Sequence, residues 1–325
     1  MKKLLTMALA ATLIAITAAP AQAAQKQNTL KSTTLTPTLA ILDTALDTSI
    51  PSIKERLVAE ICILDWPSCP NGKTFMEGPG SSTLPINILS TPSFDHGTQM
   101  VSAALASNPN LNIVFVRIVG NTKKGAPQTY GLNTLVNALT WVNNNKSKYN
   151  IVAVASSHAT NVPVIRMNAK SNYCLPTKVD SVISTLSNSG VPVFFPAGNS
   201  GTNPAMKDKI EWPGCIKQSV AVGGVETLNL DQPQISLISN YDKNLVDLWG
   251  EVQLPTIYPG NKTGFSYGTS VSAQAIAAKY VQLKTVFPAY TPDQLITLMK
   301  SSSVQVPSLS GQSVYFFNLL KAING

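Results

Sequence analysis

The stretch YGTSVSAQAIAAKYVQL, residues 267–283, places a glycine-flanked Thr-Ser pair before a run of small and apolar residues. Its composition predicts a helix that begins beside Ser270. Gly268 allows the backbone to turn sharply just before that helix, because glycine lacks a Cβ. A serine in this place has two interpretations. It packs as one small residue among others, or it is a nucleophile held at a helix N-terminus.

Apolar strands alternate with amphipathic helices throughout the chain. The predicted strands are 39–43, 111–120, 150–157, 191–199 and 219–225, and the predicted helices are 131–145, 178–190, 269–286 and 291–303. This alternation is typical of a mostly parallel sheet with helices on both faces. In such sheets reactive groups gather at the carboxyl ends of strands, where Asp43 and Asn199 stand. We find no internal repeat and no linker, so we expect one α/β domain.

The first 23 residues have the three-part pattern of a secretory signal peptide. Two lysines precede a short apolar run, and the triplet Ala21-Gln22-Ala23 offers a cleavage site. An uncleaved anchor is the alternative, but the apolar run is short for a bilayer span. We therefore expect an exported protein, periplasmic or secreted, without stable membrane insertion after cleavage. Residues 24–38 are expected to form a short polar leader, and residues 39–325 the folded domain.

Composition argues against a nucleic-acid partner. Hydrophobic residues make up 44% of the chain and charged residues 12%, so a sizeable core can form. The formal net charge is +8, of which two lysines belong to the signal segment, leaving 8 − 2 = +6. The basic residues are scattered, without a basic run or interleaved aromatic residues.

Four cysteines follow the export signal, and an even count in an oxidising compartment predicts two disulfides. Of the three possible connectivities we favour Cys62–Cys69 with Cys174–Cys215. The spacing lacks the paired pattern of a zinc site, and the chain has only two histidines, so we expect no metal centre. No cofactor is evident. An acidic calcium loop is absent from the sequence, although calcium held by backbone carbonyls would leave no such pattern.

Two histidines are candidates for a general base. His158 follows a predicted strand, and His96 precedes a glycine and a helix-like run. A base that activates a serine needs a carboxylate to orient its ring. Asp43, at a strand end, is suited to that task. Asp47 and Asp95 compete with it, but Asp47 lies past the strand and Asp95 is adjacent to the histidine in sequence.

Five segments resemble those of the subtilisin-like serine proteases, the subtilases, in the order of that family. They are Ile41-Leu42-Asp43-Thr44, His96-Gly97-Thr98, Ala197-Gly198-Asn199, Trp212-Pro213 with Val220-Ala221-Val222-Gly223, and Gly268-Thr269-Ser270-Val271-Ser272-Ala273. One such motif is weak, but five in order are specific, and the resemblance covers residues 39–325. It implies a subtilisin-like three-layer α/β sandwich, with a mostly parallel central sheet and helices on both faces.

The resemblance also implies a role for each motif. Ser270 would be the nucleophile, and His96 the base that takes its proton and passes it to the leaving amine. Asp43 would hold the imidazole in the required tautomer. The side-chain amide of Asn199 and the backbone N–H of Ser270 would form the oxyanion hole. The substrate would be a peptide or a protein, and the oligomeric state stays open.

The chain departs from the family pattern beside the substrate. The segment at 156–159, SSHA, replaces a common S-L-G-G, so side chains stand where substrate backbone normally lies. A carboxylate at Glu211, near the floor of the primary specificity pocket, would favour a basic substrate side chain. The candidate substrate-binding residues are Ser156, Ser157, His158, Ala197, Gly198 and Glu211.

Smaller departures affect the triad segments. Ala45 replaces a family glycine, so the turn after Asp43 must avoid a left-handed conformation or bear strain. Gln99 replaces a second histidine that is not part of the triad, and Gln274 replaces a common proline. The leader is also too short to form the inhibitory pro-domain that many secreted relatives carry.

Three functions compete at this point. The first is an exported endopeptidase that works through an acyl-enzyme. The second is a catalytically silent subtilase fold that binds peptides, which the altered edge segment and the short leader favour. An esterase or lipase would need G-x-S-x-G, and Ser272 replaces the second glycine of that motif here.

Overall fold

The structure is a computed structural model that describes residues 36–128, 131–159, 173–227, 233–242, 244–307 and 313–324. The expected signal peptide, residues 1–23, and all but the last three residues of the expected leader lie outside these ranges. No helix within them is long and apolar enough to cross a membrane.

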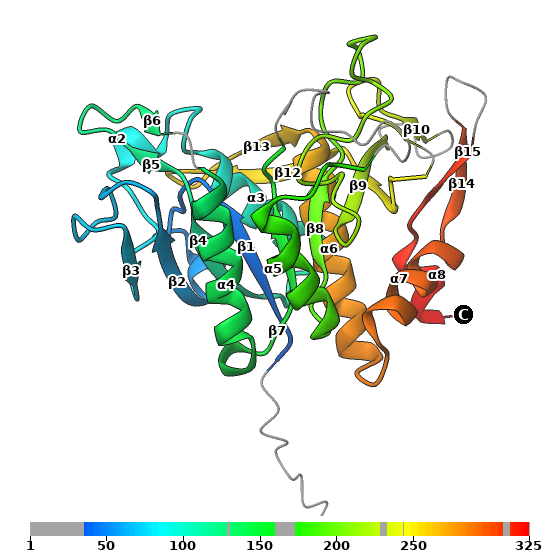
Figure 1. The fold of residues 1–325 in the computed structure, drawn as a ribbon, viewed down its shortest axis with the longest axis horizontal. Coiled ribbons are helices and arrows are strands. Elements are labelled where there is room, and N and C mark those ends of the chain that lie inside the picture. Colours follow the sequence, from blue (N-terminus) through cyan, green and yellow to red (C-terminus); the bar gives the residue numbers. More distant parts are fainter. Residues whose placement is uncertain are drawn as a thin grey trace, which may run out of the picture. The chain divides into compact units, whose positions relative to one another are not determined.

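A mixed, mostly parallel sheet forms the centre of the domain (Figure 1). Its strands lie in the order β14-β15-β11-β9-β8-β7-β1-β4-β2-β3, with β10 added beside β9. Their bounds are β1 (Thr38–Asp43), β2 (Leu57–Ile63), β3 (Phe75–Glu77), β4 (Asn112–Arg117), β7 (Ile151–Ser156), β8 (Val193–Pro196), β9 (Val220–Glu226), β10 (Gln234–Ile235), β11 (Leu248–Glu251), β14 (Val304–Pro307) and β15 (Ser313–Phe316). The pairings from β2 through β11 to β15 are parallel, whereas β3, β10 and β14 pair antiparallel.

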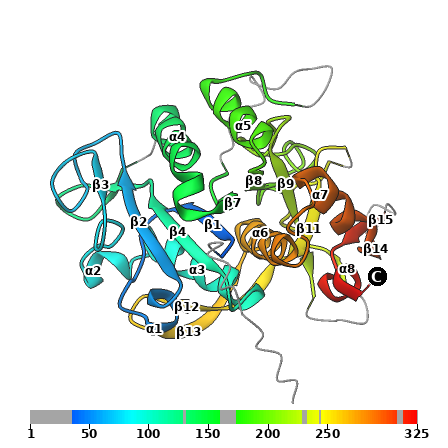
Figure 2. The same ribbon diagram turned by 90° about the horizontal axis from the view of Figure 1, so that it is seen from below.

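Helices cover both faces of this sheet. Their bounds are α1 (Pro51–Lys54), α2 (Ile86–Leu89), α3 (His96–Ser107), α4 (Leu132–Tyr149), α5 (Lys178–Asn188), α6 (Thr269–Val286), α7 (Pro292–Ser301) and α8 (Leu319–Asn324). Figure 2 shows α4 and α5 on one face and α3 and α6 on the other. The three-layer α/β sandwich predicted from the sequence is therefore confirmed.

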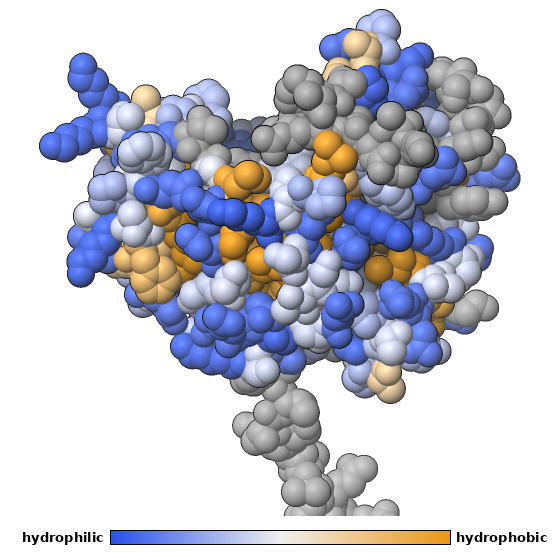
Figure 3. Space-filling model, viewed as in Figure 1, coloured by the Kyte–Doolittle hydropathy of each residue, from blue (hydrophilic) through white to orange (hydrophobic). Residues whose placement is uncertain are grey.

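Side chains that alternate along the strands build one core on each face. Val114 and Val116 of β4 pack with the helices α4 and α5. Ile113 and Phe115 of the same strand pack with α3 and α6 on the other side. Because both faces are buried, the inner strands read as continuous apolar runs. Outside these cores, the face in Figure 3 is mostly hydrophilic, and apolar side chains show through around α4 and α5.

A hairpin that the sequence patterns did not predict leads into the 267–283 stretch. Its strands are β12 (Gln253–Tyr258) and β13 (Lys262–Tyr267), which pair antiparallel. Its turn contains Gly260 and Asn261, both with positive φ. A second small sheet joins β5 (Gly120–Asn121) to β6 (Pro127–Gln128).

Two disulfides link the cysteines in the connectivity favoured from the sequence. Cys62 pairs with Cys69, with 5.9 Å between their Cα atoms. Cys174 pairs with Cys215, at a Cα–Cα distance of 5.3 Å, and the N–H of Cys174 also donates to the carbonyl of Cys215. The second bridge ties the start of the α5 segment to the chain just after Trp212-Pro213.

Candidate active site

Asp43 and His96 form a hydrogen-bonded pair at the carboxyl edge of the sheet. Asp43 ends β1, and its side chain is completely buried. Its Oδ1 lies 2.8 Å from Nδ1 of His96, which is the first residue of α3. The other ring nitrogen, Nε2, is therefore available for proton transfer, while 35% of the imidazole side chain stays exposed.

The pair perturbs the pKa of both partners. Burial by itself would raise the pKa of Asp43, but the charge of His96 and its hydrogen bond outweigh it and lower that pKa. Desolvation likewise would lower the pKa of His96, but the Asp43 carboxylate raises it above the ordinary 6.5. The carboxylate is therefore ionised at neutral pH and stabilises the protonated imidazole.

Small residues let α3 begin directly against the end of β1. A Cβ on Gly97 would lie 2.3 Å from the carbonyl oxygen of Ala45 and 2.9 Å from the ring of Phe115. The N–H of Gly97 donates to Oγ1 of Thr44. Ala45 itself does not have positive φ, so the turn avoids the left-handed conformation that its side chain would strain.

The competing carboxylates are engaged elsewhere. Oδ1 of Asp47 accepts from the backbone and hydroxyl of Ser49, and its Oδ2 accepts from the N–H of Gly260. Asp95 bonds the side chain of Gln99. Asp43 is thus the carboxylate that contacts the imidazole.

Ser270 is the second residue of α6. The helix begins at Thr269, directly after Gly268, whose φ is +148°. In the first turn of a helix no intrahelical carbonyl can accept from its N–H. Val271 packs against Met100, one helical turn beyond His96, so the starts of α3 and α6 are neighbours. The hydroxyl of Ser270 donates to the backbone oxygen of Ser157 at 3.3 Å. Among the described residues no hydrogen bond joins Ser270 to His96.

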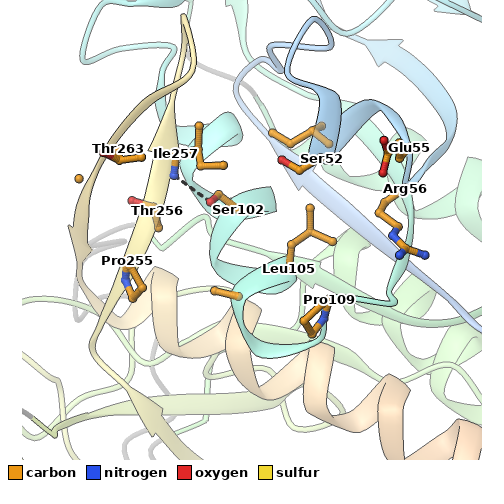
Figure 4. Close-up of a pocket in the computed structure, with 13 residues that line it drawn as sticks. Ser52, Glu55, Arg56, Ser102, Leu105, Pro109, Pro255, Thr256, Ile257 and Thr263 are labelled. Carbon is orange, nitrogen blue, oxygen red and sulfur yellow. Dashed lines mark hydrogen bonds between the residues drawn. The ribbon is translucent and has the colours of Figure 1, made fainter.

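Polar contacts join α3 to the β12–β13 hairpin that leads into α6. Oε1 of Gln99, on α3, accepts from the hydroxyl of Ser266 at 2.6 Å, four residues before Ser270. Farther along α3, Ser102 Oγ accepts from the N–H of Ile257 at 2.8 Å, the dashed line in Figure 4. That contact borders a pocket of about 480 Å³ that contains none of the predicted catalytic residues.

Asn199 lies beside the start of α6 with its amide orientation fixed. Its Oδ1 accepts from both the N–H and the hydroxyl of Thr269, each at 2.9 Å. Because only an oxygen can accept from an N–H, the opposite atom is the Nδ2 donor. That Nδ2 lies 3.5 Å from where a Cβ on Gly268 would be. Gly198, with φ +114°, supplies the turn that presents Asn199 at the surface.

The sites predicted from the sequence therefore lie at the carboxyl ends of β1 and β8 and at the starts of α3 and α6. They are Asp43, His96, Asn199 and Ser270. A model of the subtilase family matches residues 36–315.

The chain belongs to the subtilase family.

Its relatives include the major intracellular serine protease of Bacillus subtilis (strain 168), which is 25% identical over 258 residues, or 76% of this chain and 68% of the relative. Among solved structures it resembles a protease of Pseudoalteromonas arctica PAMC 21717, with a TM-score of 0.66 and 18% identity over 90% of this chain and 91% of that one. It also resembles a lanthipeptide protease, with a TM-score of 0.63 and 17% identity over 89% and 87%. These two similarities show the fold of the chain. As a subtilase the chain is a serine endopeptidase that acts on peptides or proteins.

The segment that departs from the subtilase pattern lies next to the pair. Ser156 is fully buried at the end of β7. The carbonyl of Ser157 accepts from the hydroxyl of Ser270, and Oγ of Ser157 accepts from Nε2 of Gln274 at 2.8 Å. The sequence patterns did not indicate this contact. The family pattern marks Gln274 only as the replacement of a common proline.

His158 lies within electrostatic range of both members of the pair. Burial lowers its pKa to about 4; the Asp43 carboxylate opposes that shift, and His96 adds to it. His158 is therefore neutral at pH 7, and it adds no positive charge beside His96. Its role in shaping the cleft stays a prediction.

Glu211 lies beneath the Asn199 turn. Its side chain is 7% exposed, and its Oε1 accepts from the hydroxyl of Ser200 at 2.7 Å. Burial raises the pKa of this carboxyl, while hydrogen bonds from Ser200 and from the N–H of Asn199 oppose the shift. The expected preference for basic substrate side chains stays a prediction.

Metal ligands do not cluster in the part of the chain that the structure describes: no group of three or more His, Cys, Asp or Glu side chains is placed to hold an ion.

Proposed function

We propose that the chain is an exported serine endopeptidase that cleaves peptide bonds through an acyl-enzyme on Ser270. The observation that carries this proposal is the buried 2.8 Å contact between Asp43 and His96 at the start of the helix that packs beside Ser270. An ionised carboxylate orients the imidazole through Nδ1, which leaves Nε2 as the nitrogen that can accept a proton.

Peptide cleavage then follows in two steps. His96 takes the Ser270 proton as Oγ attacks the substrate carbonyl, and returns it to the leaving amine. The Asn199 Nδ2 and the Ser270 N–H stabilise the oxygen that gains charge. Water enters after the amine leaves, His96 takes its proton, and hydrolysis of the ester restores Ser270.

The contact between Ser270 and Ser157 describes the resting nucleophile. Rotation about the Cα–Cβ bond of Ser270 is the motion that moves its hydroxyl from the Ser157 carbonyl toward the imidazole. Catalytic hydrogen bonds are often long or misaligned before substrate binds.

A fluorophosphonate probe tests the nucleophile directly. We expect the probe to modify Ser270, and peptide mapping by mass spectrometry to find the label on the α6 peptide. Ser272→Ala is the matched control, because Ser272 is a serine of the same helix turn whose hydroxyl instead donates to the carbonyl of Glu251. It should label like the wild type. A folded wild-type protein that takes up no label, or takes it elsewhere, contradicts the proposal.

A silent peptide-binding subtilase is the second candidate, and the Ser270–Ser157 contact favours it. Such a protein would bind peptides in the same cleft and leave them intact. Absence of labelling together with peptide binding measured by calorimetry would support it.

Export is proposed from the signal-like residues 1–23, and the two disulfides favour an oxidising compartment. We expect the exported protein to begin at Ala24, after the triplet Ala21-Gln22-Ala23. N-terminal sequencing of protein from the periplasm or the medium checks this. A mature chain that keeps residues 1–23 would exclude it.

A further inference from the structure

The Glu211 side chain occupies the space immediately under the turn that carries Asn199. Its Oε1 accepts from the hydroxyl of Ser200 at 2.7 Å, and the backbone N–H of Asn199 faces the same carboxylate and acts to lower its pKa. The backbone N–H of Glu211 donates to the carbonyl of Ala197 at 2.9 Å. Glu211 therefore contacts the turn on both sides of Gly198, at Ala197, Asn199 and Ser200.

Gly198 makes room for this arrangement. A Cβ at Gly198 would lie 2.5 Å from both Cγ and Cδ of Glu211, and its φ of +114° is one that other residues rarely adopt. The side chain of Glu211 thus fills the volume that a larger residue at 198 would need.

The remaining contacts of the turn act on other atoms. Thr269 fixes the side-chain amide of Asn199, and the N–H of Asn240 donates to the carbonyl of Gly198 at 3.0 Å. The backbone N–H of Asn199 faces the Glu211 carboxylate, and the N–H of Ser200 donates to Oδ1 of Asn240 at 2.6 Å. Glu211 and Asn240 together therefore support the backbone that carries Asn199.

We infer that Glu211 is a positioning residue for the oxyanion hole. It holds Asn199 in the position from which Nδ2 can donate to the negatively charged substrate oxygen of the transition state. Its carboxylate bonds the turn at residues 197–200 and does not bind a substrate side chain. The inference rests on the proposed function, because an oxyanion hole has meaning only where a carbonyl is attacked.

Two variants separate positioning from specificity. Glu211→Ala removes the acceptor, and Glu211→Gln keeps an oxygen acceptor but removes the charge. Loss of an oxyanion donor costs about 10²–10³ in kcat, so a displaced donor should cost about 10–100-fold in Glu211→Ala. KM should stay within about 2-fold, because the interaction is made mainly in the transition state. Glu211→Gln should restore most of kcat.

The substrates for this measurement are paired peptides that differ only in Arg or Leu at the residue before the cleaved bond. Positioning predicts an equal loss of kcat for both peptides in Glu211→Ala. A carboxylate that reads the substrate predicts a selective loss for Arg, in Glu211→Gln as well as in Glu211→Ala. That selective loss overturns the inference.

Hydrogen exchange at residues 197–201 provides a readout independent of catalysis. We expect faster exchange in Glu211→Ala and exchange like the wild type in Glu211→Gln, with thermal unfolding used to compare global stability. Unchanged exchange in Glu211→Ala contradicts the inference even if the enzyme is silent. If the wild type fails to label at Ser270 while Glu211→Ala alone loosens the turn, the proposed function fails and the positioning contact stands.

Discussion

Replacing Ser270 with alanine should lower kcat by about 10⁶-fold, and replacing His96 with alanine should lower it by a similar factor. Without the serine no acyl-enzyme forms, and without the imidazole the hydroxyl keeps its proton. Because the two residues act as one unit, the double variant should be no slower than either single variant. A fluorogenic peptide assay with saturating substrate measures each kcat.

The control for this series is Ser272→Ala, whose hydroxyl bonds the Glu251 carbonyl away from the pair. It should keep kcat within about 3-fold of the wild type, in line with a change that removes one ordinary hydrogen bond. Two results would show that the two side chains do not act together. One is a small decrease of kcat in Ser270→Ala, and the other is a decrease in the double variant equal to the product of the two single decreases.

Asp43→Asn should lower kcat by about 10⁴-fold while leaving the backbone in place. The amide can no longer hold the imidazole in the required tautomer or stabilise its charged form. The variant also tests the electrostatics. In the wild type the carboxylate raises the pKa of His96 above 6.5, so activity should rise with pH through a value above 6.5. Without that charge desolvation dominates, and the acidic limb should move to lower pH.

The matched control is Asp95→Asn, which removes the carboxylate adjacent to His96 in sequence. Asp95 contributes only the smallest of the interactions that raise the pKa of His96. Its loss should therefore change kcat less than 10-fold and shift the acidic limb little. A larger loss of kcat in Asp95→Asn than in Asp43→Asn would contradict this prediction, because it would show that Asp95 orients the imidazole.

Sequence order predicted which residues would meet, because the motifs stand at strand ends and helix starts. Asp43 and His96 are 53 positions apart, yet they contact each other in the fold. Parallel strands bring their carboxyl ends to one edge, and this rule needs no knowledge of side-chain conformation. For the same reason the three-layer architecture could be predicted from the alternation of elements.

Side-chain direction could not be predicted in this way. The sequence places Glu211 near the floor of the primary specificity pocket, but it does not indicate that the carboxylate accepts from the hydroxyl of Ser200. The contact of Gln274 with Ser157 joins residues 117 positions apart, and no local pattern indicates it. The β12–β13 hairpin did carry a signal, because Pro259-Gly260-Asn261 is a turn sequence between two strand-like segments.

The positions of β1 and α6 in the chain have a consequence for when proteolytic activity can appear during folding. The strand with Asp43 is held between β4 and β7, and His96 follows early in the chain, whereas Ser270 arrives with α6. Under the proposed export, a chain that crosses a membrane from its N-terminus delivers Asp43 and His96 first and Ser270 last. Under the proposed mechanism, hydrolysis begins only when α6 packs against the sheet, so a partly translocated chain has no nucleophile.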